Sequence, residues 1–195
     1  MRPYRISFKY QFLLMILLFC NVSFAQSVAS RNLSMNIEAD AILYHQDGSI
    51  YAAGGWNAPH IYKIHTNDSV SIFATGLTGI VDMVWGTNDT IIGSSYQQGR
   101  LLKIAPDGTW SNWVQSSVGI ASLYKDINGD IIGTINPGLN HPSSGSVIKV
   151  SPNGQISAFA SGGTIYKPGG ITQDSAGNYY TVSYTHLTLP TKRIV

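Results

Sequence analysis

The chain repeats itself with a period of about forty residues. A lysine within an apolar tetrapeptide recurs at close to this interval, and an aromatic side chain follows ten positions after each one. The lysine and aromatic pairs are Lys63 and Phe73, Lys103 and Trp113, and Lys149 and Phe159. Self-similarity at a fixed period predicts a repeat architecture in which each copy is one supersecondary unit.

Each repeat has the pattern of four short strands. Runs of four to six β-branched and aromatic residues are separated by two-residue turns of the types that tolerate positive φ in tight hairpins. These turns are Asp47-Gly48, Asn67-Asp68, Asn88-Asp89, Asp107-Gly108, Asn128-Gly129, Asn153-Gly154 and Gly177-Asn178. Four strands in every forty residues predict an all-β propeller built from four-stranded antiparallel blades. A sandwich is the structural alternative, but it does not explain one lysine and one aromatic residue at constant phase.

The repeats divide the chain into segments. We expect residues 26–39 to be a lead-in and residues 40–182 to form about three and a half blades, part of a six-bladed ring of roughly 240 residues. The phase is lost from Ser183 onward, and residues 183–195 resemble translated adapter sequence. We interpret them as a tail of non-native origin, with a natural edge strand as the alternative.

Residues 1–25 have the pattern of a secretory signal peptide. Arg2, Arg5 and Lys9 precede the apolar run 12–20, and Ala25 ends a small-residue cleavage motif. This apolar run is too short to span a bilayer. The sequence therefore predicts a secreted or periplasmic protein without a membrane span.

Cleavage after Ala25 would change the composition of the chain. Nine of the 12 Lys and Arg residues would remain with all 10 Asp and Glu, so the net charge would be 9 − 10 = −1. The only cysteine, Cys20, would leave with the peptide, which excludes disulfides and thiol chemistry. Nothing basic enough to attract nucleic acid remains.

Strand parity predicts which connections carry function. Alternate connections of a meander lie at the same end of the sheet, so the tight turns share one end. The remaining connections share the opposite end, and they are longer and more irregular. Binding residues favour such loops on a rigid scaffold. We expect a ligand at this end, which we call the loop face, with binding candidates Trp56, His60, Tyr96, Arg100, His141, Tyr166 and Lys167, and with Asp82 facing the central channel. For each of these residues, an ordinary role in a surface loop is the alternative.

The segment Pro168–Val182 resembles an NHL repeat, with Gly-Ile, then Asp174, then Gly177-Asn178 before an apolar strand. The residue pattern of the repeats is also similar to that of streptogramin-lyase-like propellers and of the gluconolactonase family that includes senescence-marker proteins. The resemblance covers residues 40–182 and implies a propeller fold. It leaves the function open, because such propellers include hydrolases, lyases and binding modules.

The gluconolactonase resemblance implies a divalent cation such as Ca²⁺ held by a Glu, two Asn and an Asp. Glu38 stands where the family has its Glu, although the Gly and Pro that follow it there are missing. Asp82 is an unconventional substitute for one Asn, and the other two positions do not match. We therefore predict ligand recognition, of a small molecule, carbohydrate or peptide, as the leading function. A metal-dependent hydrolase and a structural exported domain are the alternatives.

Overall fold

A computed structural model describes residues 33, 37–138, 145–163, 165–183 and 192–194. The chain divides into two compact units, residues 1–32 and 33–195, and all described residues belong to the second. The predicted signal peptide and most of the lead-in lie outside the described residues. No helix within the described ranges is long and apolar enough to cross a membrane.

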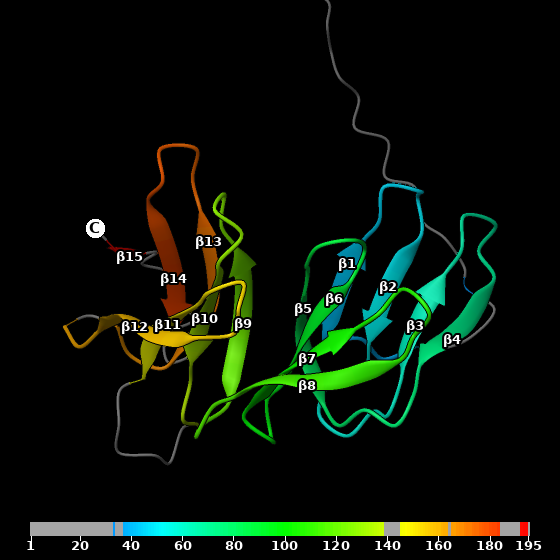
Figure 1. The fold of residues 1–195 in the computed structure, drawn as a ribbon, viewed down its shortest axis with the longest axis horizontal. Helices are drawn as coiled ribbons and strands as arrows, with labels where there is room; N and C mark the ends of the chain where they lie inside the picture. Colours follow the sequence, from blue (N-terminus) through cyan, green and yellow to red (C-terminus); the bar gives the residue numbers. More distant parts are fainter. Residues whose placement is uncertain (1–32, 34–36, 139–144, 164, 184–191, 195) are drawn as a thin grey trace, which may run out of the picture. The chain divides into compact units, whose positions relative to one another are not determined.

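The described residues form four antiparallel sheets, which we call blades one to four (Figure 1). Blade one contains β1 (Ala41–Tyr44), β2 (Ile50–Ala53), β3 (Ile61–Ile64) and β4 (Val70–Ala74). Blade two contains β5 (Ile80–Trp85), β6 (Ile91–Ser95), β7 (Arg100–Ile104) and β8 (Trp110–Gln115). Blade three contains β9 (Ile120–Lys125), β10 (Ile131–Ile135), β11 (Ser146–Val150) and β12 (Ile156–Ser161). Blade four contains β13 (Pro168–Gln173), β14 (Tyr179–Ser183) and β15 (Lys192–Ile194).

The strand order within each sheet follows the sequence, so every blade is a simple meander, as predicted. The tight turns are also confirmed: Gly48, Gly108, Gly129, Gly154 and Gly177 have φ between 83° and 87°. At Asn88 and Asp89 both residues have positive φ, 52° and 54°, as a type I′ hairpin turn requires.

The motif that resembles an NHL repeat has a clear structural role in the turn between β13 and β14. The Asp174 carboxylate accepts hydrogen bonds from the backbone N–H groups of Ala176 and Asn178, from the Asn178 amide and from the Tyr180 hydroxyl. These bonds hold the pKa of Asp174 down, at about 2, with those of Asn178 as the largest cause. The Asp and Asn of the motif therefore fix a hairpin.

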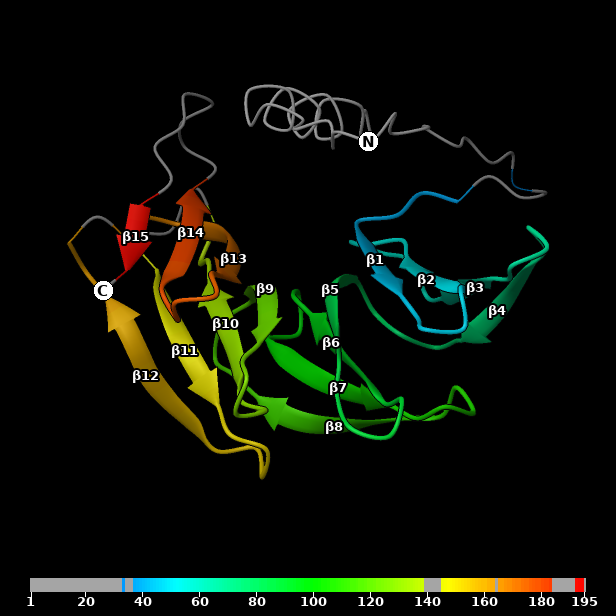
Figure 2. The ribbon, with the colours of Figure 1, turned by 90° about the horizontal axis from the view of Figure 1, so that it is seen from above.

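Consecutive blades pack through their first strands, because β1 contacts β5, β5 contacts β9 and β9 contacts β13 (Figure 2). One apolar cluster fills each of the three boundaries. Two fully buried hydroxyls also cross the boundaries: Ser94 donates to the Ile120 carbonyl, and Thr134 donates to the Gly169 carbonyl, at 3.1 Å in the second case. The second strand of each of these two blades is thus tied to the next blade.

Two details of the fourth blade differ from the sequence pattern. Pro168 pairs with the last residue of the second strand of its blade, as Ile80 and Ile120 do in theirs. Lys167 is therefore the equivalent of Gly79 and Gly119, where the earlier blades have glycine. The backbone of β15, within the segment expected to be a non-native tail, pairs with β14 as a third strand.

Candidate functional site

A cavity of about 360 Å³ lies where three blades present their irregular connections. Its lining residues come from corresponding segments of three blades, about forty residues apart. The set at the start of the first strand of each blade is Asp40, Val81 and Ala121, and the set in the connection between the second and third strands is Trp56, Tyr96 and Asn136. The repeat itself therefore builds the cavity.

Two contacts join the three connections around this cavity. The indole of Trp56 stacks on the phenol ring of Tyr96, with centroids 5.5 Å apart and planes inclined by 32°. The Tyr96 hydroxyl in turn donates a hydrogen bond to the backbone carbonyl of Asn136, at 2.6 Å. Burial raises the pKa of Tyr96, so the phenol stays protonated and able to donate at neutral pH. Aromatic faces from two blades are thus held in a fixed relation to the third.

Small residues allow these aromatic connections to sit close to the neighbouring blade. A Cβ atom on Gly119 would lie 2.6 Å from the Tyr96 ring, and one on Gly79 would lie 2.5 Å from the Trp56 carbonyl oxygen. Both distances are shorter than van der Waals contact. The glycines that precede β5 and β9 therefore determine where Trp56 and Tyr96 can lie.

Asp40 supplies the negative charge of the cavity. It directly precedes β1, where its N–H donates to the Ala53 carbonyl at 2.9 Å, and its side chain is exposed. The carboxylate lies against Gly55, since a Cβ atom at Gly55 would overlap it. The cavity therefore combines one carboxylate with two aromatic rings.

Among the predicted binding residues, Trp56 and Tyr96 line this cavity, and Trp56 is 55% exposed. His60 and Arg100 do not line it. The His60 ring packs edge-on against Tyr62, with centroids 5.7 Å apart, and its buried Nδ1 has no hydrogen-bond partner. The Arg100 guanidinium lies 5.9 Å from the Trp110 ring centre, a cation–π contact within its own blade.

The connection into the fourth blade carries two of the predicted binding residues, and these differ in exposure. Tyr166 is 47% exposed, whereas Lys167 is only 2% exposed, with its ammonium 5.4 Å from the Tyr166 ring centre. Lys167 is buried because this connection packs against the third blade, where the Asn136 amide donates to the Lys167 carbonyl at 3.4 Å. Lys167 therefore has no surface to offer a ligand. His141 lies outside the described residues.

Asp82 connects two blades through hydrogen bonds of its carboxylate. One carboxylate oxygen accepts the Met83 N–H at 2.8 Å. The other accepts the Ser122 hydroxyl at 2.8 Å and the Leu123 N–H at 2.7 Å, both from the next blade. Because both oxygens are engaged, we assign Asp82 a structural role between the two blades.

The candidate metal ligand Glu38 is an exposed residue ahead of β1. Nowhere in the described ranges do three or more His, Cys, Asp or Glu side chains gather as a metal site would require. Ca²⁺ takes six to eight oxygen ligands. The described side chains around Glu38 and Asp82 do not fit that requirement.

Asp40, Val81, Ala121 and Asn136 were not among the candidates predicted from the sequence. Of these four residues, only Asp40 was named from the sequence, as the first residue of the predicted blades. The available signal was spacing, since Trp56, Tyr96 and Asn136 follow one another at the period of the repeat. Applying that period to the predicted Trp56 and Tyr96 would have found Asn136.

Comparison of the fold with solved structures gives clear matches. A streptogramin B lyase superposes with a TM-score of 0.62 at 15% identity, covering 83% of this chain and 56% of that one. A gluconolactonase from Xanthomonas campestris gives 0.60 at 12% identity, covering 75% and 54%. Virginiamycin B lyase from Staphylococcus aureus gives 0.58 at 14% identity, covering 73% and 47%. The fold is a β-propeller.

The propeller matches rest on structure alone. No family model matches the sequence. No curated protein matches it either. The chain spans about half the length of the solved structures to which it is similar. With so few identical residues, these relations establish a propeller fold and leave the activity open.

Proposed function

We propose that this protein is an exported recognition module that binds a carbohydrate in the loop-face cavity. The observation that carries the proposal is that corresponding segments of three successive blades line one cavity, where Trp56 and Tyr96 occur together with Asp40. The predicted signal peptide supports export, where soluble saccharides and glycans are available as ligands.

The chemistry of the lining favours a sugar over the peptide and small-molecule alternatives. Exposed aromatic faces cover the apolar C–H surface of a pyranose ring, and a carboxylate accepts charge-assisted hydrogen bonds from its hydroxyls. The cavity volume of about 360 Å³ lies within the usual range for small-ligand sites. An exposed indole supported by a second ring is also a rigid contact surface that costs little conformational entropy on binding.

The hydrolase alternative is supported by the likeness to a gluconolactonase. A lactonase of this type would require a cation whose Lewis acidity polarises the lactone carbonyl. Of the six lining residues, only Asp40 carries a carboxylate, and the Asn136 amide is already bonded to Gly138 and Lys167. These lining residues do not supply the oxygen ligands that such a cation needs, so we favour recognition over hydrolysis.

Oligosaccharide binding, screened on a glycan array and measured by calorimetry, tests the proposal. Trp56→Ala and Tyr96→Ala should each weaken binding of the selected glycan by at least about tenfold, the loss of one well-packed aromatic contact. Tyr166→Ala is the matched control, because Tyr166 is an exposed aromatic residue of the predicted loop face that does not line the cavity.

Two outcomes would contradict carbohydrate recognition. One is the absence of saturable binding to any glycan on the array. The other is equal loss of affinity in the Tyr166→Ala control. Thermal unfolding with added Ca²⁺ separates the hydrolase alternative, since a cation at a hundredfold excess over its dissociation constant stabilises the folded state by about 2.7 kcal/mol.

A further inference from the structure

A second cavity, of about 120 Å³, lies between blades two and three at the end that carries the tight turns. Its volume corresponds to roughly four water molecules. Two lysines line it, Lys103 from β7 and Lys125 from the end of β9, together with Trp113 and Thr90. None of its described lining residues is acidic.

Lys103 belongs to the repeated lysine position, and the other two copies are neutralised. The Lys63 ammonium lies 3.6 Å from the Asp47 carboxylate, and the Lys149 ammonium forms an ion pair with Asp130. Each of these lysines pairs directly across from the second residue of the second strand in its blade. The three positions are therefore structurally equivalent, and only their charge partners differ.

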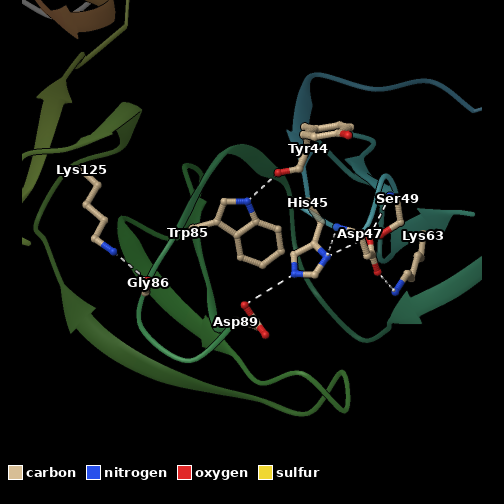
Figure 3. Close-up of polar contacts among 9 residues, drawn as sticks. All are labelled: Tyr44, His45, Asp47, Ser49, Lys63, Trp85, Gly86, Asp89 and Lys125. Carbon is tan, nitrogen blue, oxygen red and sulfur yellow. Dashed lines mark hydrogen bonds and ion pairs between the residues drawn. The ribbon is translucent and has the colours of Figure 1, made fainter. Parts of the chain in front are cut away.

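The second blade lacks both of these carboxylates. Strand register places Asn88 at the position of Asp47, and Thr90 at the position of Asp130. The one acidic residue of this turn, Asp89, lies beside His45 of the first blade (Figure 3). Within the described residues no ion pair involves Lys103, whose ammonium lies over the Trp113 ring, 4.5 Å from its centre.

Lys125 adds a second positive charge and also creates the space. It occupies the position that Trp85 occupies one blade earlier, where the indole packs into the first boundary and donates to the Tyr44 carbonyl at 2.7 Å. At the second boundary, the Lys125 ammonium donates to the Gly86 carbonyl at 2.7 Å (Figure 3). An ammonium carries three donors, so two remain after this bond.

We propose that this cavity binds a compact oxyanion, such as a phosphate, sulfate or carboxylate group, between Lys103 and Lys125. Two ammonium groups at one partly enclosed site repel each other, and an anion bound between them is attracted to both. An oxyanion would accept charge-assisted hydrogen bonds from both, and the Trp113 ring would remain beside Lys103. This inference is independent of the proposed function, because it concerns another cavity at the opposite end of the strands.

The test is a titration of the protein with inorganic phosphate, sulfate and acetate at constant ionic strength, which keeps general screening fixed. The ¹⁵N-labelled indole signals report the site, and the signal lost in Trp113→Phe identifies Trp113. We expect a saturable shift of that signal, and the three anions show which oxyanion geometry the site prefers. Lys103→Met should weaken binding by about tenfold, whereas Lys63→Met, at the neutralised copy, should leave it unchanged.

Thr90→Asp distinguishes the proposal from an effect on folding, because it restores the carboxylate that the third blade has at Asp130. It should abolish anion binding without lowering the melting temperature, while Thr90→Asn, which has the same size without the charge, should still bind. The proposal is overturned if none of the three anions gives a saturable shift of the Trp113 signal, or if Thr90→Asp binds as tightly as the unmodified protein.

Discussion

The His45 imidazole lies across the first blade boundary from Asp89, with Nε2 3.5 Å from the carboxylate oxygen (Figure 3). Its other nitrogen, Nδ1, lies 2.9 Å from the Asp47 carboxylate of its own turn. The contact with Asp47 is the largest cause of a pKa raised above 6.5, and Asp89 adds to it. When it is protonated, the imidazole links the turns of two blades through these two carboxylates.

This contact predicts that the protein becomes less stable as the pH rises through neutrality. Because the folded-state pKa of His45 is raised, its stabilising effect is complete below the unfolded pKa of about 6.5 and is lost as the pH passes the folded value. Melting temperatures measured from about pH 5.5 to pH 8.5 should fall over this interval, and His45→Gln should flatten the curve. Asp89→Asn should reduce the slope in part. Parallel curves for all three proteins would refute this assignment.

We predict that Asp82, a binding candidate from the sequence, contributes to the stability of the fold. Asp82→Ala would leave the partly buried donors of Ser122 and Leu123 without their acceptor, which should lower the free energy of unfolding by about 1–3 kcal/mol. Urea denaturation measures this change. Glu38→Ala is the control, since an exposed residue without such contacts should alter it by less than about 0.5 kcal/mol. Similar effects of the two substitutions would contradict the structural role.

We predict that the shape of the cavity depends on Gly119, although this residue does not line it. Gly119→Ala would place a Cβ atom 2.6 Å from the Tyr96 ring and displace that ring, with an overpacking cost of about 1–3 kcal/mol. Chemical denaturation and glycan binding should both be impaired. Gly170→Ala is the matched control, because the added atom there would meet only Val182, at 3.5 Å. Unchanged glycan affinity in Gly119→Ala would separate the Tyr96 position from recognition.

We predict that Asp174 makes the stability of the fourth blade depend on pH in acid. Its folded-state pKa of about 2 is below the usual value of 3.8, so its contribution is present above 3.8 and is lost as the pH falls through about 2. Asp174→Ala should lower the melting temperature at pH 7 and remove this part of the acid dependence. Hydrogen exchange of the Asn178 amide, which donates to Asp174 at 2.8 Å, gives a local measure. Unaltered protection of that amide would contradict the prediction.

The fold could be predicted from the sequence because the repeats record local physics. Strand alternation, turn residues and the lysine and aromatic phase are each short-range features, and all of them indicate a four-stranded unit. Asp89 with its neighbour Asn88 is an example, since the dipeptide was recognised as a hairpin turn and has positive φ at both residues. The fourth blade departs from the repeat at one such position, because Lys167 is the equivalent of Gly79 and Gly119.

The site was harder to predict because side-chain direction depends on contacts between repeats. Trp56 and Tyr96 were found because their connections are irregular and aromatic. Lys167 and Asp82 belong to equally suitable positions, yet one is buried and the other is bonded to the next blade. These differences arise from the packing of neighbouring sheets, which one repeat read by itself does not encode.

The exchange of Trp85 for Lys125 at successive boundaries has a consequence for how this molecule can change. Contacts run from each sheet to its immediate successor, so the assembly behaves energetically as a linear series of nearest neighbours. A replacement at one junction alters the charge and the space there while the other junctions keep theirs. Such modularity lets a single architecture acquire new chemistry one joint at a time.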